Sequence, residues 1–318
     1  MTLEIVLLVF GFFLLIKGAD FLVEGASSLA LTFNISQIVI GLTIVAFGTS
    51  APELIVNVFA SIKGSSELTI GNVVGSNIVN ILVILGISAI IAPLHTQKNT
   101  VWREIPFSLL AVIAILIIVN DSFFNAGNDM VSIGDGALLL LFFIIFLSYV
   151  YAISKNDSIL TEDIKTLPVK KSIIFVLIGI SGLFIGGKLI VDSAIEIARI
   201  FSISEAIIGF TIVAIGTSLP ELATSVIAAK KGNSDIAIGN VVGSNIFNIF
   251  LILGVSALIN PIEFNANLNI DLIVLLIVTL ILFFTMFTGK KRVLERWEGI
   301  ILVIGYVLYL IRFIVLPS

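Results

Sequence analysis

Residues 48–53 are Gly48-Thr49-Ser50-Ala51-Pro52-Glu53, and the same motif recurs with one substitution as Gly216-Thr217-Ser218-Leu219-Pro220-Glu221. The first copy is followed by Gly71-Asn72-Val73-Val74-Gly75-Ser76-Asn77-Ile78, which returns after the second copy as Gly239-Asn240-Val241-Val242-Gly243-Ser244-Asn245-Ile246. The offset is 221 − 53 = 168 residues, and it holds without a gap from 40/208 to 93/261, with 35 identities in 54 aligned positions. The chain therefore contains an internal repeat.

The composition predicts an all-α polytopic membrane protein. Of the 318 residues, 58% are hydrophobic and 12% are charged, and the mean hydropathy is +1.21. A soluble domain carries about 25% charged residues, whereas several apolar runs here exceed the roughly 20 residues that cross a bilayer. The chain has no cysteine, which excludes disulfides and thiolate chemistry. Its first residues lack the features of a cleaved signal peptide, so we expect the first apolar run to be retained.

Hydropathy predicts ten transmembrane helices. We expect them at about 3–31, 37–62, 68–92, 104–119, 134–153, 171–200, 205–230, 236–259, 270–288 and 296–316. The expected helix 37–62 carries Glu53, and the expected helix 205–230 carries Glu221. A carboxylate at bilayer depth is costly and by default functional, usually on an ion or proton path.

The basic residues between the helices predict the orientation. Twelve lie on one side, at positions 98, 103, 155, 165, 170, 171, 230, 231, 290, 291, 292 and 296, and three lie on the other, at 63, 199 and 312. An excess of Lys and Arg marks the cytoplasmic side. We therefore expect both termini to be extracellular, and the bias favours a cell membrane.

The repeat predicts an inverted topology. The two glutamates lie five helices apart, and because five is odd, the two copies cross the membrane in opposite directions. We expect a first five-helix repeat at 1–153, a cytoplasmic linker at 154–170 and a second five-helix repeat at 171–318. Inverted repeats of this kind are common in secondary transporters.

The repeated motif predicts a broken helix beside a polar site. Pro52 offers no N–H to the carbonyl of Gly48, and its ring crowds that carbonyl. We expect a kink that frees carbonyls around 46–49, which is tolerated at membrane depth only inside protein or beside a water-filled cavity. Thr49, Ser50 and Glu53 are spaced so that they share one helical face.

The two copies placed face to face predict a ring of oxygen ligands. Its side chains are Thr49, Ser50, Glu53, Ser76 and Asn80 from the first copy and Thr217, Ser218, Glu221, Ser244 and Asn248 from the second. Such a ring suits hard cations such as Ca²⁺ or Na⁺ and disfavours Zn²⁺ or Cu⁺. Two ionised glutamates carry a charge of −2, which one Ca²⁺, two Na⁺ or two protons neutralise. In isolation, each serine or threonine could instead bond to its own helix, but packing alone does not require the whole set twice.

These motifs resemble the α-repeats of the cation/Ca²⁺ antiporters, and most closely those of the prokaryotic Na⁺/Ca²⁺ exchangers. The resemblance covers essentially the whole chain. It implies that Glu53 and Glu221 are the central Ca²⁺ and Na⁺ ligands, and that the first and sixth helices slide as a gating pair. It adds carbonyls near Ala46 and Ala214 to the ligands named above. Some exchangers carry an aspartate at the position of Asn248, whereas here both Asn80 and Asn248 are neutral amides.

The resulting hypothesis is a secondary antiporter that exchanges Na⁺ for Ca²⁺ by alternating access. The alternatives are an H⁺/Ca²⁺ exchanger, in which protonation of a glutamate replaces Na⁺ binding, and, with less support, a Ca²⁺-selective channel. An intramembrane hydrolase using Ser50 or Ser218 would need an activating base, and the single histidine, His95, lies in a predicted loop. We therefore expect no enzyme activity, no cofactor, and no nucleic-acid or protein partner; the expected partners are Ca²⁺, Na⁺, H⁺ as a possible coupling ion, and the lipid bilayer.

Overall fold

The computed structural model describes residues 2–124, 129–154, 166–200 and 216–315, and this part of the chain is almost entirely helical. The first half contains α1 (Thr2–Thr32), α2 (Gln37–Ile40), η1 (Gly41–Val45), α3 (Ala46–Thr49), α4 (Ala51–Ile62), α5 (Ser66–Val79), η2 (Asn80–Leu85), α6 (Gly86–Ile91), β1 (Leu94–His95), η3 (Thr100–Glu104), α7 (Ile105–Ile118), η4 (Asp121–Phe124), β2 (Met130–Val131) and α8 (Ile133–Ser154). The second half contains α9 (Val169–Ile200), α12 (Leu219–Lys230), α13 (Ser234–Ile246), η6 (Phe247–Leu253), α14 (Gly254–Ile259), β3 (Ile262–Glu263), η7 (Ala266–Leu268), α15 (Asn269–Thr285), β4 (Val293–Leu294) and α16 (Arg296–Val315).

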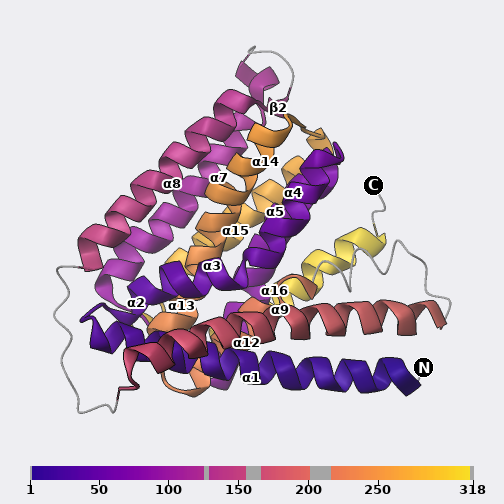
Figure 1. The fold of residues 1–318 in the computed structure, drawn as a ribbon. Helices are drawn as coiled ribbons and strands as arrows, with labels where there is room; N and C mark the ends of the chain where they lie inside the picture. Colours follow the sequence, from indigo (N-terminus) through magenta and orange to yellow (C-terminus); the bar gives the residue numbers. More distant parts are fainter. Residues whose placement is uncertain (1, 125–128, 155–165, 201–215, 316–318) are drawn as a thin grey trace.

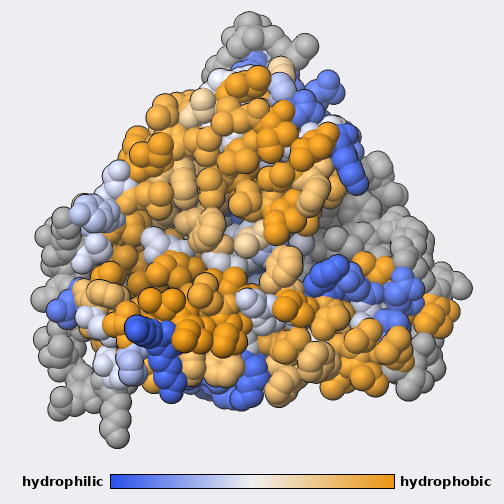
Figure 2. Space-filling view, in the orientation of Figure 1, coloured by the Kyte–Doolittle hydropathy of each residue, from blue (hydrophilic) through white to orange (hydrophobic). Residues whose placement is uncertain are grey.

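The described residues contain seven helices that are long and apolar enough to cross a membrane, and an eighth span if one bent pair is counted. This confirms the expected helical membrane protein. The helix predicted at 205–230 is described only from residue 216, and most of the expected linker 154–170 lies outside the described residues. Figure 2 shows a broad hydrophobic surface over the helices, with hydrophilic residues gathered towards the margins of the view. Lipid tails solvate such a surface without cost.

Helices α1 and α9 lie side by side along one edge of the molecule, and most of the other long helices rise from them at a steep angle (Figure 1). Their contact is built on glycine. A Cβ atom on Gly18 would lie 2.7 Å from the backbone nitrogen of Leu183, and one on Gly179 would lie 2.6 Å from that of Leu22. Glycines seven residues apart on each helix make the same contact, namely 11, 18 and 25 on α1 and 179 and 186 on α9. Small residues let two backbones meet directly in a membrane.

The predicted break is confirmed in the first glutamate-bearing helix. The pair 37–49 and 51–62 bends by 48°, and the residue at the break, Ser50, has φ −82° and ψ 5°. Ser218 has nearly the same conformation, with φ −88° and ψ 5°. The proline two residues later cannot donate to the carbonyl four residues before it, so the helix restarts there. In the described residues of both halves, a helix therefore starts directly after the equivalent serine.

The expectation that the break frees the carbonyl of Ala46 is wrong. That oxygen accepts a hydrogen bond from the backbone nitrogen of Ser50 at 2.9 Å and lies 3.3 Å from Thr49 Oγ1. The reason is that the helix remains intact as far as Thr49, so the N–H of Ser50 still reaches this carbonyl. Pro52 lacks the N–H that would reach the carbonyl of Gly48.

Short antiparallel strand pairs join loops that are distant in sequence. Strand β1 pairs with β4, so that Leu94 lies opposite Leu294, and β2 pairs with β3, so that Val131 lies opposite Ile262. Each pair links a loop of the first half to a loop of the second half. The ends of α6 and α14, which close the two repeated segments, are thereby each held to the other half.

Candidate functional site

The two glutamates of the repeated motif are buried in the interior. Glu53 lies in the first turn of α4 and Glu221 in the first turn of α12, and each residue is only 1% exposed. A helix N-terminus favours a negative charge in its first turn, which stabilises both carboxylates where the helices restart. Each carboxylate is bonded to a serine that lies three residues before the other glutamate, so the two belong to one buried site, where two negative charges would repel each other. This repulsion would be relieved by a bound cation.

Each carboxylate accepts a hydrogen bond from a serine of the other half. Ser50 Oγ donates to Glu221 Oε1 at 2.9 Å, and Ser218 Oγ donates to Glu53 Oε1 at 3.4 Å. Ser244 makes a further, longer contact with Glu221 Oε1 at 3.5 Å. The second carboxylate oxygen, Oε2, of both glutamates is buried and accepts no hydrogen bond. One oxygen of each carboxylate is therefore held in place while the other remains available.

Four asparagines cross-link the two halves beside the glutamates. Asn80 Nδ2 donates to Asn245 Oδ1 at 2.9 Å, and Asn248 Nδ2 donates to Asn77 Oδ1, also at 2.9 Å. The side chain of Asn77 donates to the backbone carbonyl of Asn245 at 3.2 Å, and the reciprocal contact measures 3.5 Å. We call these four residues the asparagine clasp.

The asparagine clasp determines which atom of each outer amide remains free. Because the NH₂ groups of Asn80 and Asn248 are occupied, their Oδ1 atoms are left over, and both are buried without a hydrogen-bond partner. Asn80 is the first residue of the π-helical turn η2, and Asn248 lies in the π-helical turn η6. Such widened turns are frequent at functional sites. Here they lie at the two amides that present free oxygens.

The other predicted ligands differ in what the structure shows of them. Thr49 Oγ1 donates to Asn240 Oδ1 at 2.9 Å, so its hydrogen is already in use. Ser76 Oγ and Thr217 Oγ1 are buried without a partner. Ala214 lies outside the described residues.

The arrangement is suited to holding a hard cation. Burying polar atoms without partners is unfavourable, yet Glu53, Glu221, Asn80, Asn248 and Ser76 each bury an unpaired oxygen. Among the described residues, no cluster of three or more His, Cys, Asp or Glu side chains could hold a metal. A cation at this place would be held by two carboxylates and neutral oxygens, a set that suits Ca²⁺ or Na⁺.

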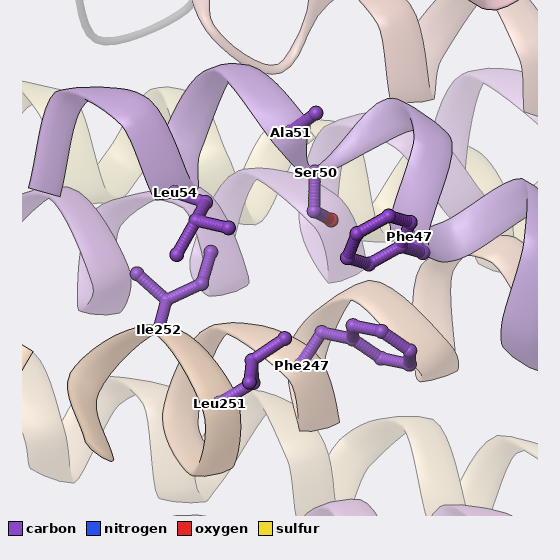
Figure 3. A pocket seen from close by; sticks show the side chains of 7 residues that line it. All are labelled: Phe47, Ser50, Ala51, Leu54, Phe247, Leu251 and Ile252. Carbon is purple, nitrogen blue, oxygen red and sulfur yellow. The ribbon is translucent and has the colours of Figure 1, made fainter. Parts of the chain in front are cut away.

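A small apolar pocket lies beside the break in the first glutamate-bearing helix (Figure 3). Phe47 and Leu54 line it from the broken helix, and Leu251 and Ile252 line it from η6. Ser50 is the polar residue in this lining, and its hydroxyl is the one that donates to Glu221. Phe47 also packs against Phe247, with ring centroids 6.1 Å apart. The lining of the pocket is therefore apolar apart from Ser50, which contacts both the pocket and a carboxylate of the site.

A sequence model described as "Sodium/calcium exchanger protein" matches residues 3–152 and 171–315. This chain belongs to the sodium/calcium exchanger family. The two matched segments correspond to the two halves of the chain and omit the region between them.

Individual exchangers and related proteins match along nearly the whole chain. The putative antiporter CaxA of Alkalimonas amylolytica is 38% identical over 320 residues, which cover 97% of this chain and 98% of the relative. The sodium/calcium exchanger MaX1 of Methanosarcina acetivorans is 34% identical over 345 residues, covering 98% of both chains. A solved structure of the sodium-calcium exchanger NCX_Mj, soaked with zero Na⁺ and Ca²⁺, superposes with a TM-score of 0.83 at 37% identity, covering 98% of this chain and 99% of that one.

Sequence reasoning missed the asparagines that support the site in this family member. Asn77, Asn240 and Asn245 were visible in the repeated motif, and their recurrence at the same offset was the signal that could have identified them. Asn240 also donates to Ser225 Oγ at 2.9 Å. These residues bind other amides, hydroxyls and carbonyls, so they belong to the scaffold around the site.

Charged residues of α1 and α9 form ion pairs with residues other than the two glutamates. Asp20 pairs with Lys231 at 2.5 Å, and Lys188 pairs with Asp192 at 3.3 Å. His95 is exposed in β1. None of these contacts joins a lysine to Glu53 or Glu221.

Proposed function

We propose that this chain is a secondary antiporter that exchanges Na⁺ for Ca²⁺ across the cell membrane by alternating access. The observation that carries the proposal is the pair of buried glutamates, each hydrogen-bonded through one oxygen to a serine of the other half and each with a free second oxygen. A charge of −2 in a buried ring of oxygens matches one Ca²⁺ or two Na⁺. Competition of these ions for the same carboxylates would couple their movements in opposite directions.

The proposed ligands are those of the repeated motif. Glu53 and Glu221 are the central ligands of Ca²⁺ and Na⁺, and the flanking ligands are Thr49, Ser50, Ser76, Asn80, Thr217, Ser218, Ser244, Asn248 and carbonyls near 46 and 214. The free oxygens of Asn80, Asn248 and Ser76 support this assignment directly. Since the Ala46 carbonyl accepts a hydrogen bond from Ser50 of its own helix, only its second lone pair would be offered to the site.

The proposed architecture is ten transmembrane helices in two inverted five-helix repeats, at 1–153 and 171–318, joined by a cytoplasmic linker. The equivalent breaks at Ser50 and Ser218 support it. So does the excess of basic residues on one predicted side, which places both termini outside. In an inverted repeat, the two halves can exchange inward- and outward-facing conformations. The same site would then open to each side in turn.

Proton coupling is the alternative within this class. Protonation of Glu53 or Glu221 would replace Na⁺ binding and still neutralise the site. The hydroxyls at both carboxylates favour Na⁺, because a proton needs no cage of oxygens. A Ca²⁺-selective channel is less well supported, because a broken-helix site at the interface of an inverted repeat is typical of carriers.

The proposal is tested by measuring radioactive Ca²⁺ uptake into proteoliposomes loaded with Na⁺ and diluted into Na⁺-free buffer. We expect uptake that requires the Na⁺ gradient and is abolished in Glu53→Gln. A matched pH gradient without Na⁺ is the control. Uptake driven only by the pH gradient would assign the chain to H⁺/Ca²⁺ exchange, and no Ca²⁺ flux from folded protein under either gradient would refute Ca²⁺ as the substrate.

A further inference from the structure

We propose that the segment 286–297, between α15 and the start of α16, together with the segment 95–104, from β1 to the end of η3, forms a binding surface for an anionic phospholipid. This basic-aromatic surface is separate from the cation site, and lipid would bind to it whether or not the chain transports Ca²⁺. Its exposed bases come from two segments that are far apart in the sequence. They are Lys98, Arg103, Lys290, Lys291, Arg292 and Arg296.

The two segments are joined by backbone contacts into one structure. Strand β1 pairs with β4, which places His95 opposite Val293. The backbone nitrogen of Thr96 donates to the carbonyl of Arg292 at 2.8 Å, and its hydroxyl donates to the same oxygen at 2.9 Å. The loop also closes on itself, because the backbone nitrogen of Arg292 donates to the carbonyl of Met286 at 2.9 Å. The bases therefore lie on a folded platform.

The acidic residues of the platform bind its own backbone and side chains and do not neutralise its surface. Glu298 is buried and accepts a hydrogen bond from the backbone nitrogen of Glu295 at 2.8 Å and another from the hydroxyl of Thr288. Glu295 is half-buried and accepts from the indole of Trp297 at 3.2 Å and from the backbone nitrogen of Lys290 at 3.3 Å. Glu104, at the end of η3, is buried and accepts from Tyr149. Asp235, next to the platform, is half-buried like Glu295 and accepts from the side chain of Gln97 at 2.6 Å. The fully exposed charges of the platform are therefore the positive ones.

Exposed aromatic rings lie next to these bases. Trp102 is 57% exposed and packs against Phe287, with ring centroids 5.4 Å apart, and against Phe283 at 5.8 Å. Trp297 is 49% exposed. Tryptophan at the membrane interface lies at headgroup level, and clusters of four to eight bases beside a membrane helix attract anionic lipids. A phospholipid with a negative headgroup matches both features, with its phosphate among the bases and its upper acyl chains against the rings.

The protein carries its own reporters for this surface, because Trp102 and Trp297 are its two tryptophans. The experiment reconstitutes the full-length chain in nanodiscs and measures quenching of tryptophan fluorescence by brominated phosphatidylglycerol or by brominated phosphatidylcholine with the same acyl chains. The first lipid is anionic and the second is zwitterionic. We expect phosphatidylglycerol to quench at a lower mole fraction, and we expect 0.5 M salt to reduce the difference, because salt screens exposed charges.

A matched pair of double substitutions identifies the residues responsible. Lys290→Gln with Lys291→Gln removes two exposed lysines from the surface, and we expect it to weaken selective quenching by about tenfold or more. Lys170→Gln with Lys171→Gln removes two adjacent lysines at the start of α9, on the same predicted side of the membrane, and is expected to leave the selectivity unchanged.

Equal quenching by the two lipids in the unsubstituted protein would overturn the proposal, since the bases would then serve only to orient the chain. An equal loss in both double variants would also overturn it, because the effect would then come from the charge of the whole face. A loss of selective quenching in Lys290→Gln with Lys291→Gln counts as support only if the unfolding temperature of this variant in phosphatidylcholine nanodiscs is unchanged. If that temperature falls, Arg296→Gln alone is used, and a failure of this variant to reduce the selectivity likewise refutes the proposal.

Discussion

Asn80 donates its side-chain hydrogen bond to Asn245, in the other half of the chain, over 2.9 Å. This contact decides which atom of Asn80 faces the site, because the oxygen of an amide can bind a cation whereas its NH₂ group can only donate hydrogen bonds. With its NH₂ group held by Asn245, Asn80 can offer only an oxygen to a cation. The equivalent contact between Asn248 and Asn77 does the same from the opposite half.

We predict that Asn245→Leu lowers Ca²⁺ affinity by about tenfold, through a lost hydrogen bond and an amide that is free to rotate. If Asn245 acts through Asn80, then adding Asn80→Ala to Asn245→Leu causes little further loss. The measurement is a double-mutant cycle on the Ca²⁺ concentration that half-saturates uptake. Additive effects of the two changes would contradict the positioning role, while Ca²⁺ uptake by the unsubstituted protein tests the proposed function separately.

Removal of the hydroxyl at Ser50 is predicted to weaken Ca²⁺ binding more than removal of the one at Ser218. Ser50 lies 2.9 Å from Glu221, whereas Ser218 lies 3.4 Å from Glu53. Hydrogen bonds to charged groups contribute about 1.5–3 kcal/mol when they are short and well aligned. Calorimetric titration of Ca²⁺ into purified Ser50→Ala and Ser218→Ala compares the two directly. Equal losses, or a larger loss at 218, would show that the structural difference between the two contacts has no energetic effect.

Adjacent glycines on α9 are predicted to respond differently to the same substitution. A Cβ on Gly186 would lie 2.6 Å from the backbone nitrogen of Leu15 on α1, whereas one on Gly187 meets described atoms only at 3.8 Å or more. Gly186→Ala must therefore push the two helices apart, at a cost of about 1–3 kcal/mol. Thermal unfolding in detergent measures the effect, with Gly187→Ala as the control. An unchanged melting temperature for Gly186→Ala would mean that α1 and α9 separate freely.

Lys63 and Lys231 occupy equivalent positions in the two copies, each followed by a glycine with positive φ, 72° at Gly64 and 81° at Gly232. The inverted topology predicts that they lie on opposite sides of the membrane. Because the chain has no cysteine, Lys63→Cys and Lys231→Cys each create a single reactive thiol. A membrane-impermeant thiol reagent should label position 63 in intact cells and position 231 only after permeabilisation. Labelling of both from the same side would exclude an inverted repeat.

Much of this architecture was predictable because membrane helices leave a strong signal in the sequence. The apolar runs gave helix positions within a few residues, and Pro52 gave the place of the break. The sequence also indicated Glu53 and Glu221, since few carboxylates lie in apolar runs. It could not indicate that each serine bonds to the glutamate of the other half, because that pairing depends on how two distant helices cross.

The asparagine clasp was hidden for a different reason. The sequence does not tell whether an asparagine is buried or exposed. Only the hydrogen-bond partners of Asn77 and Asn245 in the structure show that they hold the proposed ligands Asn80 and Asn248 in place. The glycine contact between α1 and α9 could likewise not be predicted from the sequence. Glycines spaced seven residues apart on one helix indicate a contact only once the opposing helix is known. The carbonyl of Ala46 keeps its hydrogen bond within the helix. A proline in the sequence therefore predicts where a helix breaks, but not which carbonyl oxygen loses its partner.

The exchange of hydroxyl donors between the halves has a consequence for how such a chain can change over generations. Because Ser50 donates to Glu221 and Ser218 donates to Glu53, neither copy holds a complete site, and a substitution in one copy affects a residue 171 or 165 positions away in the other. The two stretches are subject to selection as a single unit. Their near-identity today is then a record of mutual dependence as much as of common origin.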